Sequence, residues 1–248
     1  MMQFNNIALS LRALRLGGMA DALEQQLNSP NWRESSFEER LEHLITEESN
    51  LRSHRKVERI RKKAELRHNA QPENFDFSPS RGIDKSAIVS LFRCDWIRDG
   101  KTNLLLSGLT GTGKTWLACT FGHAAARQEL TVKYHRVGPL LEELEYAQHD
   151  GLRLKKMEEL KKFDLLILDD FGLDRLKRNS TIDLLSILDD RVGRKSTIVA
   201  GQMPVSDWHE YLGGDATADA IMDRLVYSSQ KIELKGESMR SKHRKAPE

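Results

Sequence analysis

The stretch that decides the fold is Gly108-Leu109-Thr110-Gly111-Thr112-Gly113-Lys114-Thr115, which matches the pattern G-x-x-x-x-G-K-S/T. An apolar run that predicts a strand, Asn103–Ser107, precedes it, and a helical pattern of apolar residues follows it. In such a loop the glycines turn backbone N–H groups toward an anion, and the helix N-terminus adds partial positive charge. We therefore expect ATP at residues 108–115, with Lys114 on the β- and γ-phosphates and Thr115 as a Mg²⁺ ligand. The alternative is a glycine-rich turn whose lysine is merely exposed.

A second apolar run, Leu165-Leu166-Ile167-Leu168, ends in Asp169-Asp170. A buried parallel strand there would deliver two carboxylates to the carboxyl edge of a sheet, where ligands of α/β proteins bind. This pattern predicts that Asp169 holds Mg²⁺ through water and that Asp170 acts as the base toward an attacking water. The alternative is a solvated pair of aspartates at the end of a strand.

Three further residues are candidates for catalysis. The predicted strand Ser196–Ala200 is followed by Gln202, whose amide would lie beside the two aspartates if this strand lies between the two motif strands. Arg224 closes a helical pattern and could act as an arginine finger in a neighbouring subunit, or else form a surface ion pair with Asp223 or Asp219. Arg240 could reach the γ-phosphate of its own subunit, or be one more basic residue of the tail.

The chain as a whole has the composition of an ordinary globular protein. It has 248 residues, 39% of them hydrophobic, and a net charge of +2. No run approaches the ~18 apolar residues of a membrane span, and the first residues lack the pattern of a secretory signal, so a cytoplasmic protein is expected. Two cysteines are too few for a zinc site or a disulfide framework, and we expect buried thiols.

The apolar patterns divide the chain into a helical part and an alternating part. Residues 1–70 read as helices, residues 71–84 as a linker rich in Pro, Ser and Gly, and residues 85–248 as alternating strands and helices. The alternation predicts an α/β domain with a parallel sheet. Its five expected strands are Asn103–Ser107, Thr131–Arg136, Asp164–Asp169, Ser196–Ala200 and Lys231–Lys235. In the helical part, Ser36 and Glu39 form a potential capping box that opens a long helix.

Several blocks of sequence carry a resemblance to a known family. Besides the two motifs above they are Leu11–Leu16, Cys94–Ile97, Gln202–His209, Asp219–Leu225 and Ile232–Arg240. With them the chain resembles the IstB family of transposition-helper ATPases of bacterial insertion sequences, within the AAA+ superfamily and close to the DnaC-type helicase loaders. The resemblance implies a P-loop AAA+ domain with a five-stranded parallel sheet flanked by helices, preceded by a small all-α domain. It also implies sensor-1, arginine-finger and sensor-2 roles for Gln202, Arg224 and Arg240, although the superfamily usually has Asn at sensor 1 and Glu at the position of Asp170.

The same resemblance implies a function in DNA transposition. It implies a homo-oligomer that assembles with ATP on double-stranded DNA with little sequence preference, deforms the DNA, and recruits and activates a partner transposase. A helicase loader of the DnaC type shares the AAA+ core and remains the alternative, and an adjacent transposase gene would discriminate between the two. A small-molecule kinase would need an acceptor pocket and a lid of its own. The basic helical module of this chain fits that class of enzyme less well.

Clusters of basic residues are candidates for the DNA-binding surface. Leu51–His68 carries eight basic and two acidic residues and no base-reading features, which suits contacts to backbone phosphates; a merely solvated helix is the alternative. The candidates in this segment are Arg52, Arg55, Lys56, Arg59, Arg61, Lys62 and Lys63. A second set, Arg153, Lys155 and Lys156, lies in the helical pair between Gly138 and Lys162, where AAA+ initiators insert a helix that lines the central channel.

Overall fold

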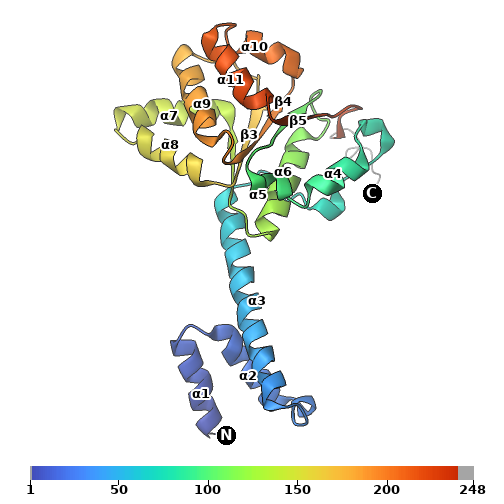
Figure 1. The fold of residues 1–248 in the computed structure, drawn as a ribbon, viewed down its shortest axis with the longest axis vertical. Coiled ribbons are helices and arrows are strands. Elements are labelled where there is room, and N and C mark those ends of the chain that lie inside the picture. Colours follow the sequence, from blue (N-terminus) through green and yellow to red (C-terminus); the bar gives the residue numbers. More distant parts are fainter. Residues whose placement is uncertain (1, 240–248) are drawn as a thin grey trace, which may run out of the picture. The chain divides into compact units, whose positions relative to one another are not determined.

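The computed structural model describes residues 2–239 of the chain (Figure 1). They form two compact units, which meet in the sequence between Arg59 and Ile60. The division falls inside one long helix, α3 (Phe37–Ala64), and about ten residues before the boundary expected near residue 70. The reason is burial: Ala64 and Ala70 are fully buried in the core of the second unit.

The first unit consists of helices. It contains α1 (Met2–Ala13), α2 (Gly17–Asn28), the short 3-10 helix η1 (Pro30–Trp32) and most of α3. The capping box at the start of α3 is confirmed: the backbone N–H of Ser36 donates to the Glu39 carboxylate (2.8 Å), and the backbone N–H of Glu39 donates to the Ser36 hydroxyl (3.2 Å).

Gly18, the second residue of α2, has a packing role. A Cβ added at Gly18 would lie 2.6 Å from the backbone oxygen of Glu47 on α3, so only glycine lets the two helices approach this closely. At the same place the buried Glu48 carboxylate accepts hydrogen bonds from the backbone N–H groups of Gly18 (2.8 Å) and Met19 (3.4 Å). Glu48 therefore caps the N-terminus of α2, which has no capping side chain of its own.

The second unit is built on a five-stranded parallel sheet in the order β2-β3-β4-β1-β5. Its strands are β1 (Asn103–Ser107), β2 (Val132–Arg136), β3 (Leu165–Phe171), β4 (Ser196–Gly201) and β5 (Ser229–Glu233). All five lie where the sequence predicts them to within a few residues, and the expected five-stranded parallel sheet with flanking helices is confirmed. Since β4 lies between β3 and β1, the polar ends of these three strands meet at one edge of the sheet.

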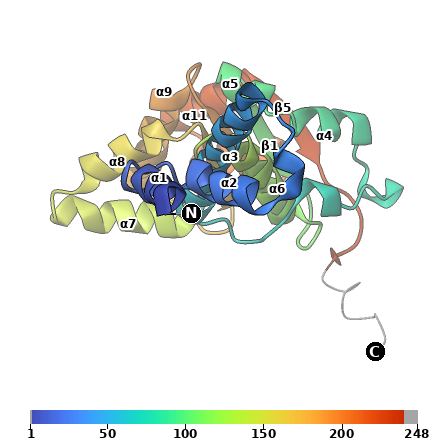
Figure 2. The same ribbon diagram turned by 90° about the horizontal axis from the view of Figure 1, so that it is seen from below.

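Helices cover both faces of the sheet (Figures 1 and 2). The buried apolar residues form two cores, one on each face. Alternate residues of one strand belong to different cores, as Leu104 and Leu105 of β1 do. The first core includes α4 (Lys85–Leu91), α5 (Asp95–Asp99) and α6 (Lys114–Arg127). The second includes α7 (Val137–His149), α8 (Arg153–Lys162), α9 (Arg178–Arg191), α10 (Trp208–Tyr211) and α11 (Ala216–Val226).

The segment expected to be a linker, residues 71–84, is part of the second unit and packs into its first core. It forms two short 3-10 helices, η2 (Pro72–Asn74) and η3 (Pro79–Arg81), and its Phe75 and Arg81 side chains are buried. Both cysteines are buried as expected. Among the described residues, no helix combines the length and the apolar character needed to cross a membrane.

Candidate functional site

The glycine-rich loop connects β1 to α6 at the carboxyl edge of the sheet. Gly108 (φ +143°) and Gly113 (φ +94°) adopt backbone conformations that other residues rarely tolerate, and they let the loop turn around its own N–H groups. The buried Lys114 ammonium donates to the backbone oxygens of Gly108 (2.7 Å) and Leu109 (2.9 Å). Phosphate oxygens are charged and therefore stronger acceptors than carbonyl groups, so this ammonium can exchange its loop contacts for a triphosphate.

A buried arginine supports the loop from the side. Arg81 donates to the backbone oxygens of Thr112 (2.8 Å) and Asp76 (2.9 Å), and its guanidinium stacks 4.6 Å from the centroid of the Phe75 ring. Burial lowers the pKa of Arg81 below its ordinary value, with Asp76 acting in the opposite direction. Arg81 thus places a cation directly behind the phosphate-binding loop.

The segment after β5 lies on the other edge of the same loop. The backbone N–H of Leu234 donates to the backbone oxygen of Ser107 (2.8 Å), at the end of β1. The backbone N–H of Met239 donates to the backbone oxygen of Gly111 (2.9 Å), in the loop itself. The next residue, Arg240, lies outside the described residues, so its predicted contact with the γ-phosphate stays a prediction.

The two aspartates lie near the end of β3, in different environments. Asp169 is buried, and its carboxylate accepts a hydrogen bond from the Tyr134 hydroxyl on β2 (2.8 Å). Burial, and next to it the Asp169 carboxylate, raises the pKa of Tyr134. Asp170 is half-buried and has a left-handed backbone (φ +57°) at a shift of register between β3 and β4. Such an irregularity redirects a side chain at the end of a strand.

Two arginines contact Asp170 from other segments of the same unit. Arg136, the last residue of β2, donates from Nε to Asp170 Oδ2 (2.7 Å), and Arg67 Nη1 lies 3.6 Å from the same oxygen. A hydrogen bond with Tyr134 is the main cause of a raised pKa of Arg67. Arg67 is therefore in contact with the groups around both aspartates.

Gln202 lies directly after β4 and contacts the glycine-rich loop. Its Oε1 accepts a hydrogen bond from the Thr110 hydroxyl (2.8 Å). The condition set by the sequence, that β4 lies between the two motif strands, is met. The side chain of Gln202 thus joins the ends of β4 and β1.

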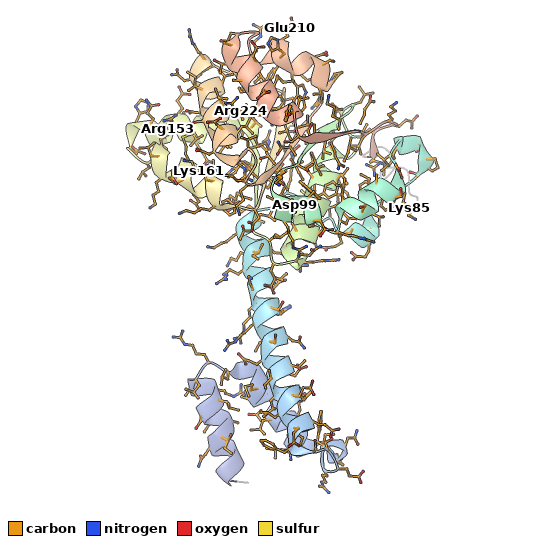
Figure 3. The ribbon with its side chains drawn as sticks, viewed as in Figure 1. Lys85, Asp99, Arg153, Lys161, Glu210 and Arg224 are labelled. Atoms are coloured by element: carbon orange, nitrogen blue, oxygen red, sulfur yellow. The ribbon has the colours of Figure 1, made fainter. Side chains whose placement is uncertain are left out.

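Arg224 projects from the last turn of α11 (Figure 3). Its Nε donates to Asp189 on α9 (2.7 Å) and its Nη1 to the backbone oxygen of Ala220 (3.0 Å), while Asp223 is 4.0 Å away. In the single chain this arginine therefore forms the surface ion pair weighed as its alternative: a long one with Asp223, as expected, and a shorter one with Asp189, which the sequence did not indicate.

The basic candidates on α3 fall in both units. In the first unit Arg55, Lys56 and Arg59 are exposed, while Arg52 pairs with Glu48 (2.6 Å) and helps to lower the pKa of that carboxyl against its burial. In the second unit Lys62 and Lys63 are exposed and Arg61 is half-buried.

The second basic set, on α8, is mostly paired. Arg153, labelled in Figure 3, forms an ion pair with Asp183 on α9. Lys156 forms one with Glu143 on α7 (3.2 Å), whereas Lys155 is exposed. Exposed apolar side chains, Tyr146 and Leu154, accompany them on the same helical pair.

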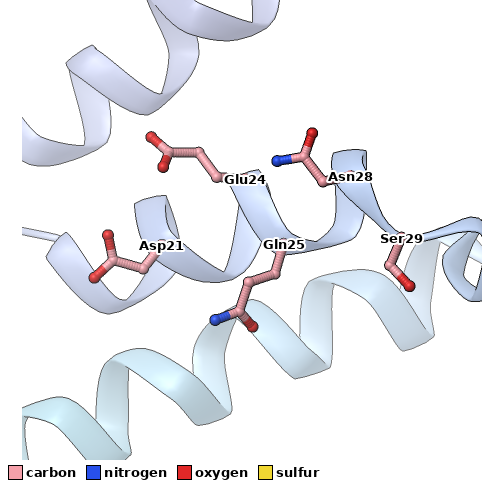
Figure 4. A pocket seen from close by; sticks show the side chains of 5 residues that line it. All are labelled: Asp21, Glu24, Gln25, Asn28 and Ser29. Carbon is pink, nitrogen blue, oxygen red and sulfur yellow. The ribbon is translucent and has the colours of Figure 1, made fainter.

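A shallow pocket lies elsewhere, on α2 of the first unit (Figure 4). It is lined by Asp21, Glu24, Gln25, Asn28 and Ser29. Two of these are acidic and already pair with Arg12, at 2.8 and 3.0 Å, so the pocket does not suit a phosphate.

Four residues that contact the motifs escaped the sequence analysis as site residues: Arg67, Arg81, Tyr134 and Arg136. A signal existed for two of them. Tyr134 and Arg136 are two residues apart in a predicted strand, which places them on one face, and Arg136 ends that strand at the edge where Asp169 ends its own. Arg67 lies in an irregular segment and Arg81 ends the three-residue 3-10 helix η3, and in neither place does a period indicate which way a side chain points.

Comparisons with known proteins agree with this geometry. Residues 9–247 match the sequence family described as IstB-like ATP binding protein. An insertion sequence ATP-binding protein of Sinorhizobium fredii is 42% identical over 235 residues, covering 95% of this chain and 96% of its own. The corresponding protein of IS1162 from Pseudomonas fluorescens is 46% identical over 197 residues, covering 79% and 85%. The crystal structure of the DnaC helicase loader shares the fold, with a TM-score of 0.56 at 17% identity over 67% of this chain and 97% of that one. The chain therefore belongs to the family of IstB-like ATP-binding proteins, and it is an ATPase whose P-loop domain has the fold of the DnaC helicase loader.

Proposed function

We propose that this ATPase assists the transposition of an insertion sequence by assembling as a homo-oligomer on double-stranded DNA and recruiting and activating a partner transposase. The observation that carries the proposal is the run of exposed basic residues on α3, which lies in the same chain as the nucleotide-binding loop. Relatives of 42% and 46% identity are named as insertion sequence proteins, which supports the transposition context.

Each residue around the loop has a separate role in ATP hydrolysis. Lys114 neutralises the β- and γ-phosphates, Asp170 acts as the base toward the attacking water, and Gln202 orients that water or contacts the γ-phosphate. Arg240 adds a cation from the same subunit. Since Asp is one methylene shorter than the Glu common at this position, hydrolysis is slow until DNA or a partner improves the geometry.

The donor set fits a nucleotide-bound Mg²⁺. Mg²⁺ usually keeps several waters and takes one or two protein oxygens besides phosphate oxygens. The buried Asp169 carboxylate and the Thr115 hydroxyl, at the start of α6, offer these two oxygens. The ion, when bound, neutralises charge on the phosphates.

Arg224 supplies the charge that a second subunit must provide. It is at the end of α11, paired with Asp189, and only 28% of its side chain is exposed. In an oligomer it exchanges this partner for the γ-phosphate of a neighbour. This makes hydrolysis dependent on assembly.

DNA is bound through its phosphates. The basic residues of α3 form hydrogen bonds and ion pairs with the backbone and not with base edges, so binding has little sequence preference and falls with salt. Lys155 on the α7–α8 pair offers a second contact. Bending of the bound DNA then follows from the arrangement of subunits along it.

A helicase loader is the second candidate, favoured by the DnaC-like fold. Purified protein is incubated with linear DNA of unrelated sequence, together with ATP, with a non-hydrolysable analogue or without nucleotide, and sedimentation measures the oligomers that form. In parallel samples, either the transposase or the replicative helicase of the same cell is added. Nucleotide-dependent oligomers on DNA that retain the transposase support transposition. Retention of the helicase alone supports loading, and DNA binding that ignores nucleotide in both the unsubstituted and the Lys114→Ala protein contradicts the proposal.

A further inference from the structure

Two arginines of the second unit are buried cations. Arg81 is 4% exposed and Arg191 is 1% exposed. Within the described part of the chain, backbone oxygens and one hydroxyl hold these guanidinium groups, and neither group forms an ion pair. Burial lowers the pKa of both, that of Arg191 to about 10. Because a buried charge is costly unless other groups compensate it, each of these arginines should have a specific role.

Arg191 is compensated within the fold. It donates to the backbone oxygens of Leu160 (2.8 Å) and Phe163 (2.9 Å). It also donates to the backbone oxygen of Ser196 (2.6 Å) and to the hydroxyl of Thr197 (3.1 Å). These groups lie where α8 ends and where β4 begins, at the edge of the sheet opposite the glycine-rich loop. Arg191 therefore binds carbonyl groups that a helix end leaves without partners, and its role is structural.

Arg81 is less completely compensated, and it lies behind the glycine-rich loop. Its Nη2 donates to the backbone oxygen of Thr112 (2.8 Å) and its Nη1 to that of Asp76 (2.9 Å). Its buried Nε has no hydrogen-bond partner among the described residues. The Asp76 carboxylate acts to raise the pKa of Arg81, but it accepts hydrogen bonds from the N–H and the hydroxyl of Ser78, both at 2.9 Å. The fold alone therefore leaves part of this charge uncompensated.

The bond to Thr112 acts on the peptide group that joins Thr112 to Gly113. This peptide bond is trans, so its C=O and N–H point in opposite directions. Since the carbonyl group binds Arg81, the N–H of Gly113 points away from the arginine. Gly113 is the N-cap of α6, and amides at the start of a helix are available to an anion. A hydrogen bond to the carbonyl oxygen also polarises the peptide group, which makes the N–H a stronger donor.

The guanidinium group packs directly on the backbone of the loop. A Cβ added at Gly113 would lie 2.6 Å from Nη2 of Arg81, so a side chain at this position would displace the arginine. The backbone oxygen of Arg81 also accepts a hydrogen bond from the N–H of Lys235 (2.9 Å), which fixes the arginine from the other side. The charge of Arg81 is thus held in place, with one peptide group between it and the proposed site of the phosphates.

We propose that Arg81 is a positioning residue for the nucleotide: it orients the peptide group between Thr112 and Gly113 and supplies a fixed positive charge behind the phosphates. In return, the phosphates compensate the buried charge when a nucleotide is bound. Because ATP carries one more negative charge than ADP, Arg81 favours ATP over ADP. The inference rests on the proposed nucleotide site at residues 108–115, and it involves neither DNA nor a transposase.

The first test measures the affinities for fluorescent analogues of ATP and ADP by equilibrium titration. Arg81→Gln keeps a side-chain donor for Thr112 but removes the charge. It should weaken the binding of the ATP analogue about ten-fold or more, as for loss of a charged hydrogen-bond donor, and that of the ADP analogue by a smaller factor. Arg81→Lys keeps the charge and should retain most of the preference for ATP. Arg81→Met, which keeps an apolar chain against Phe75, replaces the Gln variant if that variant does not fold.

The matched control is Arg191→Gln, which removes the other buried cation, or Arg191→Lys if the Gln variant does not fold. Both affinities should stay unchanged in this control, because Arg191 lies at the opposite edge of the sheet. Thermal unfolding gives a second readout. Without nucleotide, Arg191→Gln should lower the Tm more than Arg81→Gln does. The rise in Tm on adding a fixed concentration of the ATP analogue should be smaller in Arg81→Gln than in the unsubstituted protein, since this rise depends on the Kd.

Failure of the inference can be distinguished from failure of the nucleotide site. If Lys114→Ala binds the ATP analogue as tightly as the unsubstituted protein does, the loop is not the phosphate-binding site and the inference fails with it. If Lys114→Ala loses binding but Arg81→Gln keeps its affinity for ATP, the inference alone is overturned. Equal losses for ATP and ADP in Arg81→Gln would also overturn it: the loop would then merely be loosened, since both nucleotides place a β-phosphate there.

Discussion

The Thr110 hydroxyl donates a 2.8 Å hydrogen bond to Oε1 of Gln202, which joins the glycine-rich loop to the end of β4. This bond fixes the plane of the amide and leaves the NH₂ group as the donor for a phosphate or a water molecule. The loop and the residue proposed to sense the γ-phosphate are therefore coupled directly, through one side chain each.

We expect Gln202→Ala to separate binding from hydrolysis. The affinity for a fluorescent ATP analogue should change little, because Lys114 and the loop remain, while kcat should fall about 10²-fold, as for loss of one positioned donor. Thr110→Val keeps the shape but removes the bond, and should cause a smaller fall of the same kind. An unchanged kcat for Gln202→Ala would mean that Gln202 is only a turn residue and takes no part in hydrolysis.

We expect Lys114→Ala to abolish ATP binding without unfolding the protein. Lys114 is the one lysine of the glycine-rich motif, and its bonds to Gly108 and Leu109 show that it reaches over the loop. Titration with the fluorescent analogue measures binding, and the circular dichroism spectrum measures folding. Lys101→Ala, an exposed lysine before β1, is the control. If Lys114→Ala binds the ATP analogue as tightly as the unsubstituted protein does, the glycine-rich loop is not the phosphate-binding site.

The sequence predicts the scaffold of the site well because short-range patterns determine it. Apolar runs flanked by helical periods give the five strands, and the Ser36–Glu39 pair gives the start of α3. These features depend on residues that are neighbours in the chain. The position of Gln202 follows as well, once the order of strands is known.

The contacts between segments could not be predicted in this way. Residues 71–84 have the composition of a linker, yet Phe75 and Arg81 are buried in the second unit, since tertiary contacts outweigh local propensity. The pairing of Arg67 with Asp170 joins residues about a hundred positions apart, and it depends on a turn after α3 that has no periodic signal. Prediction from patterns therefore finds the motifs but not the side chains that restrain them.

We expect the salt dependence of DNA binding to depend on α3. Replacing the exposed Arg55, Arg59, Lys62 and Lys63 by Gln should reduce the slope of log K against log salt by up to about 3–4, since each phosphate contact contributes roughly 0.9. The control replaces four exposed basic residues elsewhere, namely Arg93, Lys101, Arg178 and Arg194. If the α3 variant keeps its slope, the helix is only a solvated face and Lys155 becomes the better candidate.

We expect the stability of the second unit to depend on Asp164 in a pH-dependent way. Burial alone would raise the pKa of Asp164, but bonds from Lys195 (2.5 Å) and from the Thr131 hydroxyl (2.7 Å) and backbone N–H (2.8 Å) lower it below its ordinary value. A pKa lowered in the folded state contributes stability above the unfolded pKa, about 3.9, and this contribution is lost as the pH falls through the folded value.

Asp164→Asn should therefore reduce the free energy of unfolding by about 1–3 kcal/mol at pH 7. The difference from the unsubstituted protein should shrink below about pH 5, as that protein becomes protonated too. Urea titrations followed by tryptophan fluorescence at pH 7, 5 and 3.5 measure it, since three of the four tryptophans lie in the second unit. A difference that stays constant with pH would mean that packing and not charge is lost.

Assembly can be tested through Arg224, because a finger acts only across a subunit boundary. An arginine finger contributes roughly 10³–10⁵ in rate where it operates, so Arg224→Ala should hydrolyse ATP far more slowly while binding it normally. Asp189→Asn distinguishes the two roles of this arginine: it breaks the ion pair within the chain but leaves a finger free to act, so activity should persist. Mixing Arg224→Ala, which keeps an intact nucleotide pocket, with Lys114→Ala, which keeps an intact finger, should restore activity on DNA that neither protein shows alone. If mixed oligomers form without rescue, or if Asp189→Asn loses activity as Arg224→Ala does, the ion pair with Asp189 is the whole role of Arg224.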